Sequence, residues 1–284
     1  FMKVGLVNIA LELFSNKKFN SVKNVIDMGT KEMRVSFDQL KYAFDQTNIK
    51  FNKKKFKKLK IFPKGKRIST KLFWQELGIK KYKCSDINKN LDSIYIDLNK
   101  PFTDKKYLNK FDLVTDFGNN EHVFNIGEAY KTMYELCKKE GFIWIFQSVY
   151  SGNGFFNFDM SFFEGYAAAN NLSIVHSCYL VHINEYEQFI IPCNKELFNV
   201  LDLTKIKDVS ISYIFRKNSN KKFKYYYQYN VKNNCSPFKV MFINNKISAE
   251  KIYVPTSDLK DIRKKAKKGD KDSIDWLRAL GKKI

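Results

Sequence analysis

The segment Phe111-Asp-Leu-Val-Thr-Asp-Phe-Gly-Asn-Asn-Glu-His-Val123 indicates most about this chain. An apolar run of strand length ends there in a polar turn that contains an acid and a histidine. In open α/β sheets, ligands bind beyond the carboxyl ends of the strands, where turn side chains and backbone groups can reach them. The segment therefore predicts a binding site at the end of a buried strand.

The rest of the sequence alternates strand-like apolar runs with helical patterns. Strands are predicted over residues 24–29, 81–86, 91–98, 111–117, 142–146, 172–183 and 209–216, and helices over 4–14, 36–47, 69–77, 128–139 and 161–170. Residues 190–205 are expected to be irregular. This alternation is typical of right-handed crossovers in a parallel sheet. We predict an α/β protein with a Rossmann-like, seven-stranded, mostly parallel sheet flanked by helices, and a C-terminal helical appendage.

The length of 284 residues and the 44% hydrophobic content allow one large domain with an appendage. We assign residues 1–217 to the sheet domain and residues 218–284 to a basic accessory or lid region. Five scattered cysteines without a CxxC pair favour neither a zinc site nor a disulfide framework, and no metal site is expected. Because no apolar run is long enough to span a bilayer, we expect a cytoplasmic protein with no membrane partner.

The chain carries a formal net charge of +22. Residues 50–71 contain eleven basic side chains and no acid. Such a run can grip a polyanion, but runs of charge are more often solvated faces, and the Lys-rich, Asn-rich composition is typical of an AT-rich coding sequence. We interpret the run as a solvated face and keep a nucleic-acid partner as the second hypothesis.

Five short segments together resemble the class I S-adenosylmethionine-dependent methyltransferases. They are Asp27-Met-Gly-Thr-Lys-Glu-Met-Arg-Val-Ser36, Ser85-Asp-Ile-Asn88, Tyr95-Ile-Asp-Leu-Asn99, Phe111-Asp-Leu-Val-Thr-Asp-Phe-Gly118 and Glu121-His-Val-Phe-Asn125. They are most similar to the bacterial branch with a Phe-Gly turn and Glu-His-Val after the fourth strand. One departure is clear. The first loop of that family has a second or third glycine, whereas Thr30, Lys31 and Glu32 follow Gly29 here.

The resemblance implies S-adenosylmethionine as the cofactor and assigns roles to residues at the strand ends. Asp27 and Gly29 would line its methionine end, and Asp86 would accept hydrogen bonds from the ribose hydroxyls. The other implied cofactor-binding residues are Asp97 and Leu98 beside the adenine, and Asp116, Phe117 and Gly118 in the turn beneath the sulfonium. The alternative for an acid at a strand end is that it caps the next helix.

His122 is the candidate general base, because an imidazole titrates near neutral pH and can accept a proton from a hydroxyl. Its alternative role, shared with Glu121, is to cap the following helix. Glu121, Phe155 and Phe156 are the candidate substrate-binding residues, the two aromatics belonging to the glycine-containing loop 151–158.

The sequence thus predicts an enzyme that transfers a methyl group from S-adenosylmethionine to a small-molecule or sugar-like acceptor. The Asn-Pro-Pro-Tyr type of turn found in DNA amino methyltransferases does not follow the fourth strand. Two alternatives are an RNA methyltransferase that uses the basic run, and a non-catalytic descendant that binds a nucleoside or a partner.

Overall fold

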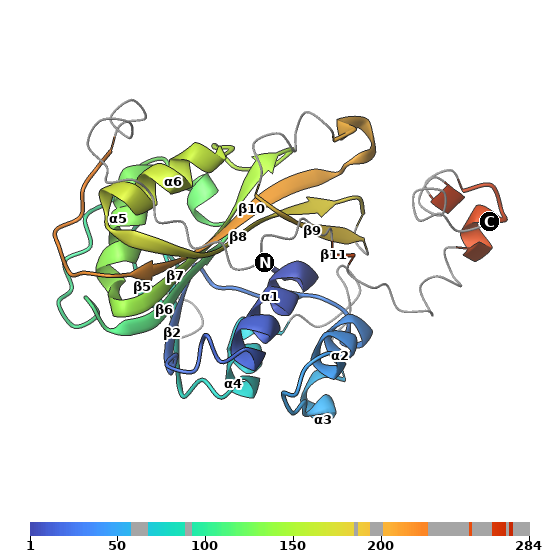
Figure 1. Ribbon diagram of the computed structural model, residues 1–284, viewed down its shortest axis with the longest axis horizontal. Helices are drawn as coiled ribbons and strands as arrows, with labels where there is room; N and C mark the ends of the chain where they lie inside the picture. The colour runs from blue at the N-terminus through green and yellow to red at the C-terminus, as the bar shows by residue number, and fades with distance from the viewer. Residues whose placement is uncertain are drawn as a thin grey trace.

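The computed structural model describes residues 1–57, 68–88, 93–184, 187–193, 201–226, 250–251, 263–270 and 273–274. Helices cover both faces of one large sheet (Figure 1). The strands of this sheet are β2 (Asn24–Met28), β4 (Lys81–Asp86), β5 (Ile94–Tyr95), β6 (Phe111–Phe117), β7 (Cys137–Tyr150), β8 (Leu172–His182), β9 (Gln188–Pro192), β10 (Asp208–Lys217) and β11 (Glu250–Lys251). Two short strands, β1 (Met2–Lys3) and β3 (Met33–Arg34), pair separately in parallel.

The helices are α1 (Val4–Ser15), α2 (Phe37–Asp45), α3 (Lys53–Phe56), α4 (Thr70–Glu76), α5 (Ile126–Leu136) and α6 (Met160–Ala169), with two 3-10 turns, η1 (Asn120–His122) and η2 (Leu203–Lys205). Capping residues mark the ends of two of these helices. Ser36 and Gln39 form a reciprocal capping box at α2, with bonds of 3.1 and 3.0 Å. The Ser69 hydroxyl caps α4, and Gly78 follows that helix with a φ of +82°.

Among the described residues the strand order of the sheet is β11-β9-β8-β10-β7-β6-β2-β4-β5. Every pair from β5 to β7 is parallel. β10 runs antiparallel to both β7 and β8, so that β8 is parallel to β7. The prediction of a mostly parallel α/β sheet flanked by helices is confirmed.

The number of strands differs from the prediction, because the described sheet has nine strands rather than seven. β9 and β11 extend the edge beyond β8 by antiparallel pairing. β9 begins before the segment expected to be irregular and runs into it. Three of its five residues, Phe189, Ile190 and Ile191, are of types that favour strands, and the neighbouring β8 supplies its hydrogen-bonding partners.

Two predicted boundaries also shift. The helix expected over 128–139 ends at Leu136, and Cys137 already pairs with Phe111 of β6. Sheet pairing has outweighed the helical pattern at this point. The strand expected over 91–98 is described only for Ile94–Tyr95, and residues 91–92 lie outside the described residues.

Strand alternation places a hydrophobic core on each face of the sheet. Val25, Phe117 and Trp144 belong to the core that α1, α2 and α4 cover. The adjacent residues of the same strands contribute to the second core, under α5 and α6. Both faces of the central strands are therefore dry, and the polar strand ends are where a ligand can reach the sheet.

The chain beyond β10 continues to pack on this domain as far as residue 226. The Tyr134 hydroxyl donates to the Lys221 carbonyl at 2.9 Å, and Phe223 is buried in the core under α5 and α6. The domain boundary at residue 217 stays a prediction, and the residues on both sides of it pack on the sheet domain. Most of the expected basic appendage lies outside the described residues, which include a helical turn at 263–266. Across the described residues, no helix combines the length and apolarity required to cross a membrane.

Candidate functional site

The sheet has a topological switch point between β2 and β6. From β2 the chain moves outward to β4 and β5, then returns to β6 on the other side of β2 and continues to β7. The connections at the carboxyl ends of β2 and β6 thus diverge, which leaves the crevice where such sheets bind ligands. The Gly29 loop follows one of these strands and the Gly118 turn follows the other.

Gly29 allows the two loops to approach each other closely. Its φ is +75°, and a Cβ at this position would stand 2.6 Å from the Asn119 Oδ1 atom and 3.3 Å from the Lys31 ammonium. A side chain here would meet both steric contact and backbone strain. Glycine at this position therefore permits the close approach of the Asn119 and Lys31 side chains.

Asp116 organises the turn that follows β6. Its carboxylate accepts backbone N–H bonds from Asn119 at 2.9 Å and Asn120 at 3.2 Å, and a further bond from the Gln147 amide on β7. Complete burial raises the pKa of Asp116 to about 6, against the opposing effect of Lys31 and the backbone donors. This acid holds the turn in shape and leaves a partly titrating negative charge beneath it.

Asp27, at the end of β2, is enclosed by protein. Thr70 and Tyr82 donate to one carboxylate oxygen at 2.6 and 2.9 Å, and Thr115 donates to the other. Burial raises its pKa, which these hydrogen bonds partly oppose. Contact of Asp27 with a cofactor stays a prediction. In the structure this carboxylate ties β2 to α4, β4 and β6.

Asp86 is better exposed, at the end of β4. It accepts bonds from the Thr30 hydroxyl at 2.9 Å and the Asn88 backbone N–H at 2.9 Å. Burial raises its pKa, but the hydrogen bonds from Asn88 and Thr30 outweigh this and hold the pKa below its usual value. Asp86 is therefore an ionised acceptor that faces the Gly29 loop.

Asp97 and Leu98 follow β5. Asp97 accepts the Asn99 backbone N–H at 3.0 Å and pairs with Lys100 at 3.1 Å, whereas Leu98 is buried in the core under α5 and α6. These local bonds shape a turn. Residues 98–110 contain no helix, so Asp97 does not play the alternative role of a helix cap. The adenine contact of both residues stays a prediction.

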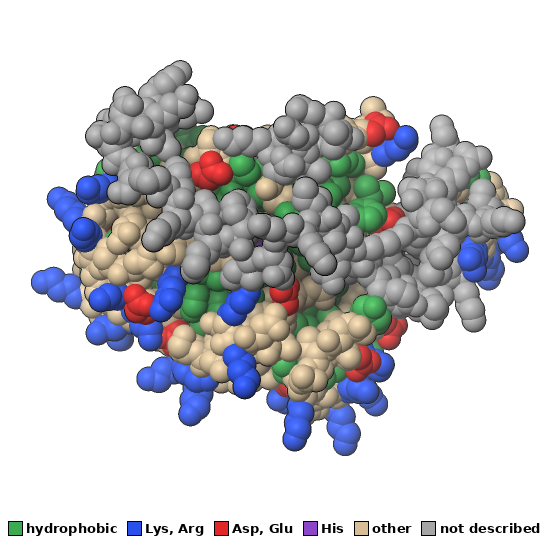
Figure 2. All heavy atoms as spheres, viewed as in Figure 1, with side chains coloured by type: hydrophobic (Ala, Val, Ile, Leu, Met, Phe, Trp, Pro, Cys, Tyr) green, Lys and Arg blue, Asp and Glu red, His purple; other side chains and the backbone are tan. Residues whose placement is uncertain are grey.

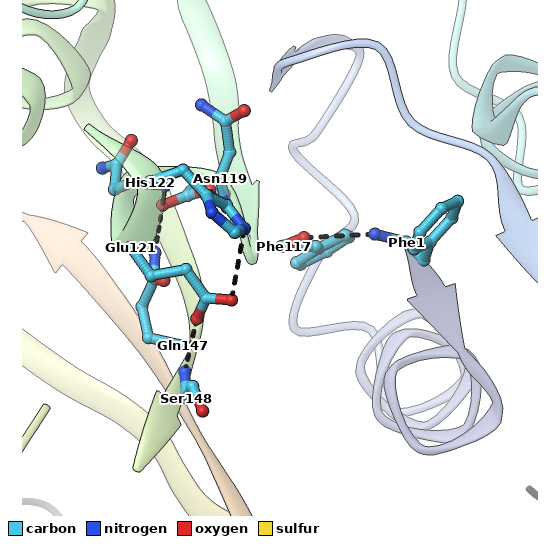
Figure 3. A network of polar contacts seen from close by, with 9 residues as sticks. Phe1, Phe117, Asn119, Glu121, His122, Gln147 and Ser148 are labelled. Atoms are coloured by element: carbon cyan, nitrogen blue, oxygen red, sulfur yellow. Dashed lines mark hydrogen bonds and ion pairs between the residues drawn. The ribbon is translucent and has the colours of Figure 1, made fainter. Parts of the chain in front are cut away.

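Glu121 and His122 lie in η1, directly after the Asp116 turn (Figure 3). Glu121 is 7% exposed, and its Oε2 atom accepts the Ser148 N–H at 2.8 Å. Its Oε1 atom lies 3.6 Å from the His122 Nε2 atom. The imidazole is about half exposed. The buried, fixed glutamate thus faces a histidine that solvent can reach.

The loop 151–158 folds onto this turn. The Phe155 and Phe156 backbone N–H groups donate to the Glu121 carbonyl at 2.7 and 3.3 Å. Gly154 lies so close that a Cβ would stand 2.6 Å from the same carbonyl. The Phe155 side chain is exposed, and Phe156 packs at the margin of the core. The structure thus brings together Glu121 and the backbone of both predicted aromatics.

Phe117 and Gly118 form the end of β6 and the start of the turn. The Phe117 ring packs edge-on against Trp144, and its carbonyl accepts a bond from the Phe1 amino group at 3.3 Å (Figure 3). Gly118 has a φ of +70° and donates its N–H to the Phe146 carbonyl at 2.8 Å. These residues shape the turn, and sulfonium contact by them stays a prediction.

Sequence reasoning missed two side chains of the crevice. Lys31 is only 5% exposed and interacts electrostatically with Asp116, Asp27, Glu121 and Asp86. Gln147 on β7 is fully buried against Asp116. The replacement of a loop glycine by lysine was visible in the sequence, whereas nothing there marked Gln147, because its role depends on the register of β6 against β7.

No family model and no curated protein matches this chain. Solved structures do resemble it. An N-methyltransferase, NodS, from Bradyrhizobium japonicum is 10% identical over 75% of this chain and 94% of its own, with a TM-score of 0.37. An S-adenosylmethionine-dependent methyltransferase from Mesorhizobium loti is 9% identical over 68% of this chain and 90% of its own, with a TM-score of 0.36. Another, from Archaeoglobus fulgidus, is 12% identical over 76% of this chain and 95% of its own, with a TM-score of 0.35. Likeness of this degree does not bear on function, which has to be inferred from the site.

Proposed function

We propose that the crevice between β2 and β6 binds S-adenosylmethionine, and that the protein transfers the methyl group to a small-molecule or sugar-like acceptor. The observation that carries this proposal is the set of carboxylates around the switch point. Asp86 and Asp116 lie near the ends of β4 and β6, Glu121 lies in η1, and all three act on the Lys31 charge. A ligand with sulfonium and ammonium groups is attracted to such a set.

The residues present fit this ligand in two further respects. Asp86 is ionised and partly exposed, as an acceptor for two ribose hydroxyls should be. The exposed Ile87 side chain follows it directly and offers an apolar surface to a purine ring.

When bound, the cofactor would supply an electrophilic methyl carbon on a sulfonium sulfur. The protein's part is then to align an acceptor and to remove its proton. His122 accepts the proton that an acceptor hydroxyl loses. Glu121, which the Ser148 N–H holds in place, stabilises the imidazolium that forms. Catalytic contacts are often long in the absence of substrate, so the 3.6 Å separation is compatible with this pairing.

The test is calorimetry with S-adenosylhomocysteine on the parent and on Asp86→Ala. Loss of the ionised carboxylate that accepts hydrogen bonds from the ribose should weaken binding about tenfold to a hundredfold. Asp45→Ala is the matched control, because Asp45 is exposed on α2 and pairs only locally with Lys41 at 2.7 Å. If folded Asp86→Ala binds as tightly as the parent, the ribose assignment is wrong, and if the parent binds neither this ligand nor S-adenosylmethionine, the proposed function is wrong.

A second candidate function follows from the residue that replaces the loop glycine. Lys31 lies in the crevice itself, and a chain that has lost catalysis could keep such a side chain while it binds a nucleoside or a partner. This candidate predicts binding of S-adenosylhomocysteine without methyl transfer to any hydroxylated acceptor. The first candidate predicts both.

A further inference from the structure

Lys31 is a buried cation that the proposed reaction does not yet use. It is the third residue after β2, and its carbonyl accepts the Thr70 N–H at 3.2 Å, which ties the loop to α4. Its side chain turns back over the end of the strand, because its ammonium lies 3.3 Å from the point where a Gly29 Cβ would stand. The Lys31 ammonium therefore lies beside Gly29, at the switch point between β2 and β6.

The surroundings of this ammonium are acidic but not in contact with it. Asp116, Asp27, Glu121 and Asp86 all act on its charge, while burial lowers its pKa more than these acids raise it. Within the part of the chain that the structure describes, its N–H groups make no hydrogen bond and no ion pair. A buried ammonium with open donors is costly unless a partner arrives.

The loop backbone has little left to offer a negative group. In glycine-rich loops, backbone N–H groups receive the anionic part of a ligand. Here the Gly29 N–H donates to the Ser85 hydroxyl and the Thr30 N–H to the Asp86 carboxylate, each at 3.3 Å. A carboxylate that enters this crevice finds its cationic side chain in Lys31.

We propose that Lys31 binds the α-carboxylate at the amino-acid end of the ligand and replaces the missing glycines as its anchor. This inference rests on the proposed function. The ligand carries two cationic groups and one carboxylate, and the crevice carries the complementary set, with acids for the cations and Lys31 for the carboxylate. A charge-assisted hydrogen bond of this kind is among the stronger single contacts in a binding site.

The opposing arrangement has Lys31 as an internal substitute for the ligand's ammonium group. The lysine would then compete with the ligand for the same acids and repel its cations. The two arrangements predict opposite effects of removing the charge, so affinity measurements decide between them.

The experiment compares S-adenosylmethionine with decarboxylated S-adenosylmethionine, which keeps the sulfonium and the ammonium and lacks only the carboxylate. Both are titrated by calorimetry into the parent and Lys31→Met, which preserves side-chain length. Lys41→Met, on the exposed face of α2, is the charge-matched control. The parent should bind S-adenosylmethionine about tenfold or more tightly than the decarboxylated ligand. Lys31→Met should bind S-adenosylmethionine more weakly and the decarboxylated ligand as before, so that the preference is lost.

Two results overturn the inference. One is an unchanged preference in Lys31→Met, and the other is tighter binding of both ligands, which would identify Lys31 as the internal substitute. Circular dichroism and a second variant, Lys31→Gln, separate these results from a folding defect. If the parent binds neither ligand, it is the proposed function that fails. If the parent binds both without preference, the proposed function stands and the role of Lys31 does not.

Discussion

Asp27 and Asp116 lie at neighbouring strand ends, and their partners give them different tasks. Side chains from α4, β4 and β6 surround Asp27, so its carboxylate joins elements that are distant in sequence. The donors of Asp116 are mainly the backbone of its own turn. Asp27 therefore supports the sheet, whereas Asp116 shapes the turn that follows β6.

His122 gives the sharpest prediction at the scale of a single residue. His122→Ala should leave the affinity for S-adenosylhomocysteine within about twofold and lower turnover by about 10²- to 10⁴-fold, the usual contribution of a positioned base. His122→Gln should not restore turnover, because an amide cannot take up the proton. The measurement is release of S-adenosylhomocysteine with an acceptor that the parent methylates. A folded alanine variant with full turnover and reduced stability would instead identify His122 as a structural residue of the turn, because Asn125 is the residue that caps α5.

At the scale of elements, the site depends on the contact between η1 and the loop 151–158. Ser148 at the end of β7 holds the Glu121 side chain, and the loop that follows β7 bonds the Glu121 carbonyl. Both ends of one residue are thus fixed by a neighbouring strand and its loop. A change in the loop should therefore affect the turn that carries Glu121 and His122 and leave the surroundings of Asp86 unchanged.

Gly154→Ala tests this dependence. Its methyl group would stand 2.6 Å from the Glu121 carbonyl oxygen and 2.8 Å from the Glu121 Cβ, so the loop or η1 must move. We expect a loss of about 1 to 3 kcal/mol in the free energy of unfolding, measured by urea denaturation. Turnover should fall while S-adenosylhomocysteine affinity stays near that of the parent. Asn153→Ala, at the exposed neighbouring position, should change neither quantity, and equal behaviour of the two variants would contradict the contact.

At the scale of the whole molecule, charge is the most unusual property, with a formal net charge of +22. On the face seen in Figure 2, the described Lys and Arg side chains project along the rim with acids among them. The described part of the basic run includes α3, where Lys53, Lys54 and Lys55 are exposed and Lys55 pairs with Glu76 at 3.1 Å. Residues 58–67 of that run lie outside the described residues.

Neutralisation of the described basic residues tests whether the run is a solvated face or a surface that binds nucleic acid. A variant with Lys53, Lys54, Lys55 and Lys57 changed to Gln should keep both its affinity for S-adenosylhomocysteine and its turnover of a small acceptor. Filter binding of a structured RNA across a salt series provides the second measurement. Strong binding by the parent that falls steeply with salt and disappears in the variant would favour an RNA acceptor instead.

Much of this architecture follows from the sequence alone. The apolar run of β6 predicted a buried strand, and the structure confirms it. The Ser36 capping box and the Gly78 stop are local as well, because helix capping depends on neighbours in the chain. The strand-end positions of Asp86, Asp116 and His122 followed from the same reasoning.

Tertiary structure alone decided the rest. The added strand β9 needs the edge of β8, and the early end of α5 needs Phe111 opposite Cys137. Whether an acid at a strand end faces a ligand or the interior depends on which side chains surround it, which is why Asp27 is enclosed while Asp86 remains accessible. Tertiary structure also buries Lys31 among four acids. The segments that carry these acids are distant in sequence and come together only when the sheet forms.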